Sequence, residues 1–211
     1  MLPCIAFFPQ FVLFMGQKES NMTTQEPVSI RLEFTPNPNT LKFVVNRELV
    51  PRGAVNFTSL DKAEKSPLAK KIFEIKGISA LLIGSNFITI TKSLEGSWDV
   101  VADGVPKTIE THLQAGGLAF DADFEFDAPP TTSAVESDIE KRIKEVLDKE
   151  IRPAVAMDGG DITLARFEEG TVYLYLQGAC SSCPSSTATL KMGVETRLKE
   201  LIPEVKEVVQ I

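Results

Sequence analysis

Two of the three cysteines in this chain, Cys180 and Cys183, stand in the run GACSSCP. A C-x-x-C pair between a strand pattern and a helix pattern can bind a metal ion, hold an iron–sulfur cluster or carry out thiol–disulfide exchange. The unpaired N–H groups and the positive dipole end of the following helix favour the thiolate form of both side chains. Because the thiolate is both the metal ligand and the nucleophile, this loop is the candidate site of the chain.

The number of available ligands narrows the choice of metal centre. A tetrahedral zinc site and a [4Fe–4S] cluster each take four protein ligands. The residues after 136 provide two cysteines and no histidine, since the single histidine, His112, belongs to an earlier part of the chain. One chain therefore cannot complete either site, but two chains related by a two-fold axis can supply four thiolates. An exposed centre shared in this way suits a cluster that is passed on better than it suits a buried structural zinc.

Two alternatives to a cluster remain open at this point. A thioredoxin-like redox pair also occupies a strand–C-x-x-C–helix junction, although here no Trp or Gly-Pro lies within the motif. A zinc-binding module would use the same two thiolates. Nearby, Asp158 and Asp161 of the DGGD run could ligate a cation as an acid pair, but a Gly-Gly turn explains the same residues more simply.

Composition and charge exclude several classes of partner. The 211 residues suffice for one or two domains, and their 43% apolar and 24% charged residues are typical of a globular protein. The net charge of −7 argues against a general nucleic-acid binder, which needs a basic face. The apolar run at residues 2–15 is broken by prolines and is shorter than the about 20 residues of a membrane-spanning helix, so we expect no membrane partner. Three cysteines do not make a secreted disulfide framework, which favours a reducing compartment.

The chain divides into two compact blocks, each predicted to be a small sheet packed with helices. We expect a disordered tail or a misassigned start at residues 1–27, a first domain at 28–113, an acidic linker at 114–136 and a second domain at 137–211. The linker prediction rests on paired glycines, paired prolines and several acidic residues without a sustained hydrophobic period. The predicted fold class is therefore α+β with two small domains.

In the first block, alternating apolar residues predict strands at 30–34 and 41–45. Ser66-Pro67 predicts the start of a short helix, because a capping hydroxyl precedes a proline in the first turn. A strand pair at 78–83 and 87–91 and a helix at 98–113 follow.

The second block places the cysteine pair between a hairpin and a helix. A capping box at Ser137 begins its first helix, whose apolar period continues to Ile151. Strands at 162–167 and 171–177 form the hairpin, and a helix after Pro184 precedes a last strand. The predicted order is α-β-β-α-β.

These residues resemble a known family. DGGD at 158–161 with LQGACSSCPSS at 176–186 resembles the NifU C-terminal domain, and TPNPNTLKF at 35–43 with SPLA at 66–69 resembles the N-terminal domain of Nfu-type proteins. Together the resemblances cover residues 30–211, and the two motif sets in this order are specific. The resemblance implies a non-enzymatic iron–sulfur cluster assembly scaffold or carrier.

In that family the C-x-x-C cysteines of two subunits hold a [4Fe–4S] cluster, so the resemblance implies that Cys180 and Cys183 are the ligands. It also implies a homodimer joined through the cluster, and the sequence leaves [2Fe–2S] open as a second cluster type. The expected partners are an upstream cluster donor and apo iron–sulfur client proteins, and the N-terminal domain would recognise partners. We expect a bacterial cytoplasmic location, with an organellar, mitochondrial location as the alternative.

Overall fold

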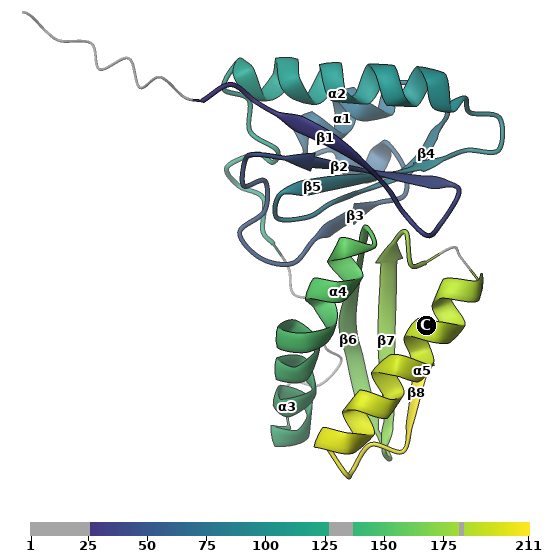
Figure 1. The fold of residues 1–211 in the computed structure, drawn as a ribbon. Coiled ribbons are helices and arrows are strands. Elements are labelled where there is room, and N and C mark those ends of the chain that lie inside the picture. Colours follow the sequence, from purple (N-terminus) through teal and green to yellow (C-terminus); the bar gives the residue numbers. More distant parts are fainter. Residues whose placement is uncertain (1–25, 127–136, 182–183) are drawn as a thin grey trace, which may run out of the picture.

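The computed structural model describes residues 26–126, 137–181 and 184–211, and the side chains of 184–187 and 189 lie outside this description (Figure 1). The tail predicted at residues 1–27 therefore falls almost entirely outside the described residues, and the linker predicted at 114–136 is described only as far as residue 126. Cys4 and Cys183 also lie outside the described residues. The described residues show an α+β fold with two sheets packed against helices, as the sequence predicts.

The N-terminal half is built on an antiparallel sheet of five strands in the order β1-β2-β5-β4-β3. Its strands are β1 (Ile30–Phe34), β2 (Thr40–Val45), β3 (Val55–Phe57), β4 (Ile78–Ile83) and β5 (Phe87–Lys92). Its helices are a 3-10 turn, η1 (Asp61–Ala63), and the α-helices α1 (Pro67–Phe73) and α2 (Trp98–Gln114). The short strand β3 was not predicted, because three residues are too few to show an alternating pattern.

Both α-helices lie on one face of this sheet and enclose the N-terminal core (Figure 1). The Ser66 hydroxyl accepts a hydrogen bond from the backbone N–H of Ala69, and Pro67 occupies the first turn, so α1 begins where the sequence predicts. Phe43, Ile88 and Ile109 are among the fully buried residues of this core. The other face of the sheet is turned toward the C-terminal half.

Phenylalanines from the start of the predicted linker also pack on the N-terminal half. Phe120 is buried, stacks on Phe57 with ring centroids 6.1 Å apart, and contacts Phe124 and Phe126. The buried Phe120 and its ring contacts with Phe124 and Phe126 stabilise this segment against the core. The acidic composition of the segment gave no sign of this packing in the sequence. The domain boundaries themselves stay a prediction.

The C-terminal half contains a three-stranded sheet in the order β6-β7-β8, with β6 and β7 antiparallel and β7 and β8 parallel. Its elements are α3 (Asp138–Val146), the π-helical turn η2 (Leu147–Ile151), α4 (Arg152–Met157), β6 (Gly160–Glu168), β7 (Thr171–Gly178), α5 (Pro184–Leu201) and β8 (Glu207–Gln210). A separate core joins its helices and strands and includes Ile143, Leu174 and Leu198.

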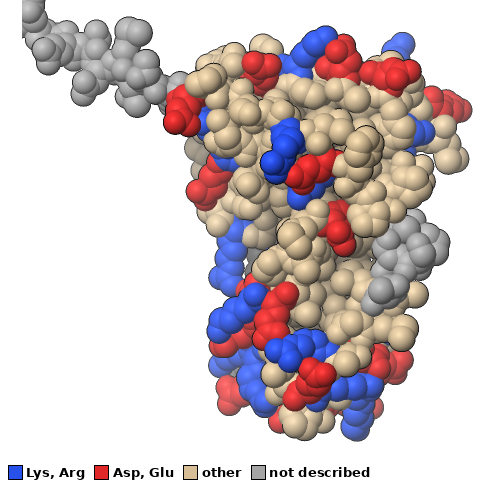
Figure 2. All heavy atoms as spheres, in the orientation of Figure 1, with Lys and Arg blue, Asp and Glu red and all other residues tan. Residues whose placement is uncertain are grey.

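Acidic and basic side chains are interspersed over the face of the molecule seen in Figure 2 rather than gathered by sign. Among the described residues, no helix combines the length and the apolar character that crossing a bilayer requires.

Candidate functional site

Cys180 lies just beyond the end of β7, in the loop that leads to α5. Its residue exposure is 4%, and its side chain packs with the core of the C-terminal half. The second predicted ligand, Cys183, lies outside the described residues, so the structure positions only one of the two thiols. The 18-residue helix α5 begins at Pro184, which directs its positive dipole end at this loop.

The loop begins with a tight turn over Gly178–Ser181. The backbone N–H of Ser181 donates to the carbonyl of Gly178 at 3.2 Å, and the Ser181 hydroxyl donates to the same carbonyl at 2.9 Å. Gly178 has a φ of +64°, a value that glycine adopts without strain. This turn fixes the backbone on both sides of Cys180.

Glycines of the DGGD run make room for the cysteine. Gly160 is paired with Gly178 across the hairpin, and a Cβ at Gly160 would lie 2.6 Å from the Sγ of Cys180. A Cβ at Gly178 would lie 2.6 Å from the carbonyl oxygen of Gly159, and that oxygen accepts a hydrogen bond from the N–H of Ala179 at 3.1 Å. The two sequence motifs are therefore one structural unit, in which small residues allow the turn and the cysteine loop to touch.

The two aspartates of that run do not form an acid pair. Asp158 is exposed, whereas Asp161 is buried and its Oδ1 lies 2.9 Å from the Nε of Arg152. Burial raises the pKa of Asp161 by more than the nearby Arg152 guanidinium lowers it. The part of the chain that the structure describes contains no cluster of three or more His, Cys, Asp or Glu side chains suited to a metal ion. The turn interpretation of this run is thus the better one.

The N-terminal half reaches the cysteine loop through Asn37, which sequence reasoning missed. The side-chain Nδ2 of Asn37 donates a hydrogen bond to the carbonyl oxygen of Ala179 at 3.0 Å, one residue before Cys180. The two residues are separated by 142 positions, so no local pattern connects them. The only signal was that Asn37 lies in the quoted TPNPN motif.

A cavity of about 490 Å³ also lies between the two halves, but it is separate from the cysteine. Its lining includes Arg52, Asp148, Arg152, Asp161 and Thr163, and it does not include Cys180. The chemistry of the candidate site therefore belongs to the loop at the start of α5, where a thiolate can ligate a metal or act as a nucleophile.

Two family models match the chain. The model described as a NifU-like domain matches residues 143–209, and the model described as scaffold protein Nfu/NifU N terminal matches residues 30–116.

Curated relatives are similar to most of the chain. The protein named "NFU1 iron-sulfur cluster scaffold homolog, mitochondrial" from Drosophila grimshawi is 43% identical over 185 residues, covering 86% of this chain and 61% of the relative. The Homo sapiens protein of the same name is 39% identical over 183 residues, covering 86% of this chain and 71% of the relative. The chain thus spans between 61% and 71% of the length of these two relatives. A solution structure of a NifU-like protein from Saccharomyces cerevisiae aligns with 52% of this chain and 98% of its own, at 24% identity and a TM-score of 0.43.

Proposed function

Because the chain belongs to the Nfu/NifU-like family of iron–sulfur cluster scaffold proteins, we propose that it carries an iron–sulfur cluster on Cys180 and Cys183 and delivers it to apo-proteins. The observation that carries the proposal is the place of Cys180, in a tight turn between β7 and the start of α5. Unpaired N–H groups and the helix dipole at that position stabilise negative charge on sulfur and on a bound cluster.

The proposed cluster is [4Fe–4S], shared between two copies of the chain. Two thiolates per chain leave half of the four ligand positions open, and a two-fold partner supplies the others. A [2Fe–2S] cluster held by the same four thiolates is the second cluster type that this ligand set accommodates.

Delivery would proceed by ligand exchange. A thiolate of the client protein replaces Cys180 or Cys183 at iron, and the released cysteine takes up the proton that the client thiol lost. The iron and sulfide keep their oxidation states in each exchange, so no external oxidant or reductant is required. A site with only two ligands from each chain favours this exchange, because each chain releases the cluster once two of its thiolates have been replaced.

The two other interpretations of the C-x-x-C pair have less support. The relatives are named as cluster scaffolds, which favours a non-enzymatic carrier over a thiol–disulfide oxidoreductase or a zinc-binding module. Their names also place them in mitochondria, which supports the organellar alternative over a bacterial cytoplasmic location. We therefore propose a mitochondrial carrier whose partners are a cluster donor and apo iron–sulfur proteins.

Anaerobic reconstitution with iron and sulfide tests the proposal. We expect a brown dimer with about four irons and four sulfides per two chains, read by absorbance, metal analysis and native mass spectrometry. Cys180→Ser and Cys183→Ser should abolish cluster binding while the chain stays folded by circular dichroism. Cys4→Ser is the matched control, because it removes the third cysteine and should bind a full cluster.

Two outcomes would contradict this function. Retention of a full cluster by Cys180→Ser or Cys183→Ser would remove these residues as ligands. A colourless monomer that binds no iron and cycles a Cys180–Cys183 disulfide would favour the redox alternative.

A further inference from the structure

We propose that the N-terminal half completes the cysteine site, with Asn37 as a positioning residue that holds the loop carrying Cys180. The importance of this position for cluster binding rests on the proposed function. The contact between Asn37 and the cysteine loop itself is present in the chain without a cluster. The proposal assigns the N-terminal half a role at the cysteine loop itself, besides the expected recognition of partners.

Asn37 presents its side chain to the cysteine loop in a fixed orientation. Its Oδ1 accepts a hydrogen bond from the N–H of Asn39 at 3.0 Å, and its carbonyl accepts one from the N–H of Thr40 at 3.0 Å. The Nδ2 is thereby directed at the carbonyl of Ala179 at 3.0 Å. Asn37 is 2% exposed and Ala179 is 3% exposed, so this hydrogen bond is shielded from water. A buried and pre-oriented donor limits the movement of the backbone that enters Cys180.

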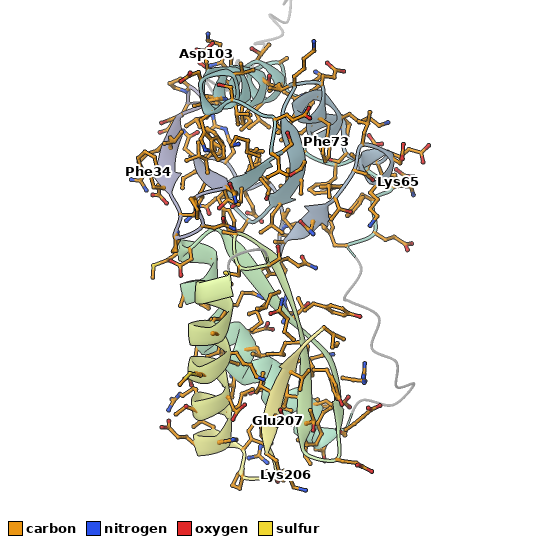
Figure 3. All side chains as sticks on the ribbon, turned by 90° about the vertical axis from the view of Figure 1, so that its right-hand side faces the viewer. Phe34, Lys65, Phe73, Asp103, Lys206 and Glu207 are labelled. Atoms are coloured by element: carbon orange, nitrogen blue, oxygen red, sulfur yellow. The ribbon has the colours of Figure 1, made fainter. Side chains whose placement is uncertain are left out.

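The sheet of the N-terminal half closes over the two glycines beside the loop. A Cβ at Gly178 would lie 2.7 Å from the Cδ2 of Leu82, and a Cβ at Gly159 would lie 2.9 Å from the Oγ1 of Thr89. Leu82 and Thr89 are fully buried although neither belongs to either apolar core. Their burial therefore comes from contact between the halves, and Figures 1 and 3 both place the ends of β6 and β7 beneath the sheet.

A second anchor lies at the end of α4. The Nζ of Lys42 donates to the carbonyl of Met157 at 3.2 Å and pairs with Glu33 at 3.1 Å. Lys42 thus binds the backbone directly before the DGGD run, and Asn37 binds Ala179, whose N–H donates to the carbonyl of Gly159 in that run. Two side-chain hydrogen bonds, from Asn37 and from Lys42, therefore cross the contact between the halves.

The reactivity of Cys180 in the cluster-free full chain tests the proposal. A Cys4→Ser/Cys183→Ser background leaves Cys180 as the only thiol, and its alkylation by iodoacetamide is followed by mass spectrometry. We expect Asn37→Ala to speed the alkylation about fivefold, because losing one buried hydrogen bond raises the population of open loop by that factor. Alkylation at the background rate would overturn the proposal.

Asn46→Ala is the matched control. Asn46 lies in the same half, accepts from the N–H of Ser29 at 2.8 Å and donates to the carbonyl of Pro27 at 3.0 Å. Its amide thus plays the same donor and acceptor roles as that of Asn37, at an exposed place away from the cysteine loop. The control should alkylate at the background rate, and an equal acceleration would show that general loosening of the half is the cause. Should Asn37→Ala unfold, Lys42→Met breaks the second anchor and should speed the alkylation in the same direction. An unchanged rate in that variant would then overturn the proposal.

A second measurement, on the chain with all its cysteines, ties the contact to the cluster. Asn37→Ala should lose a reconstituted cluster to an iron chelator about fivefold faster than the unmodified chain, with Asn46→Ala unchanged. Faster alkylation with unaltered cluster loss would overturn the positioning role. If the unmodified chain binds no cluster, the proposed function fails on its own, while the alkylation result still decides whether Asn37 holds the loop.

Discussion

Gly160 is the residue whose size most directly controls the place of the sulfur. Any larger residue there would put its Cβ 2.6 Å from the Sγ of Cys180 and 2.9 Å from the backbone oxygen of Gln177. The backbone oxygen is fixed by the hairpin, so the cysteine side chain has to move. The glycine pair of the DGGD run is thus part of the cysteine site as well as a turn.

We predict that Gly160→Ala displaces Cys180 and lowers both stability and cluster retention. Overpacking of this kind costs about 1–3 kcal/mol in the free energy of unfolding, which urea titration measures. Iron content per dimer after reconstitution should fall in parallel. Gly193→Ala is the control, because Gly193 lies on α5 and a Cβ there would meet no atom within 4 Å. Replacing this helical glycine by alanine should stabilise the chain by about 0.5–1 kcal/mol. Unchanged stability and iron content in Gly160→Ala would contradict the prediction.

At this scale the sequence predicts the cysteines but not their surroundings. Residue type and spacing nominate Cys180 and Cys183 as candidate ligands, which stays a prediction, since few other pairs of side chains carry the same chemistry. The contact of Asn37 with Ala179 crosses 142 positions, and no propensity or period reports a hydrogen bond of that range. The dependence of Cys180 on Gly160 is likewise visible only once the hairpin register is known.

The helical segment that opens the C-terminal half is longer and less regular than its sequence pattern predicts. The apolar period indicates a helix to Ile151, but helical structure continues to Met157 through a π-helical turn. Pro153 explains this, because it has no N–H to donate and its ring would collide with the carbonyl of Lys149 in a regular α-helix. The chain widens instead, and the N–H of Arg152 reaches the carbonyl of Leu147, five residues back. Periodicity could not reveal this because the π turn shifts the register.

The capping box of α3 gives the chain a pH-dependent contribution to stability. Burial, the largest single effect, raises the pKa of Glu140, but hydrogen bonds from Ser137 and from the backbone of Phe167 outweigh it, so the pKa is lowered. A carboxyl with a lower pKa in the folded state stabilises the fold above its unfolded pKa of about 4.3. That stabilisation is lost as the pH falls through the lowered folded value.

We therefore predict that Glu140→Gln destabilises the chain by about 1 kcal/mol near pH 7 and that the difference shrinks as the pH falls below about 4.3, the unfolded pKa of the carboxyl. The urea midpoint, followed by circular dichroism across that range, measures it. Glu145→Gln removes a carboxylate from the same helix without touching the cap, and its effect is subtracted. A difference that grows toward low pH would show that the carboxylate is not held in its ionised form by the cap.

At the scale of the whole molecule, the sequence predicts the two sheets but not how they meet. Alternation in β2 and β5 indicates half-buried strands with their polar side chains in solvent. The structure instead covers that face, leaving Lys42 with 7% exposure and Thr89 with none. The alternation in a single sequence shows which face of a strand is apolar. It does not show whether the polar face is exposed to solvent or buried against a second part of the chain.

The two separate cores lead to the last prediction, that residues 137–211 fold without the N-terminal half. Ile143, Leu174 and Leu198 pack within this segment, and its helices and sheet are complete in themselves. We expect a cooperative urea transition for the isolated segment and alkylation of Cys180 at least as fast as in Asn37→Ala, because the hydrogen bonds from Asn37 to Ala179 and from Lys42 to Met157 are both gone. Added residues 26–126 should slow the alkylation again in a concentration-dependent manner, since docking in trans restores the contacts of Asn37 and Lys42. A folded segment whose Cys180 reacts no faster than in the full chain would mean that the burial of this thiol comes from the C-terminal core alone.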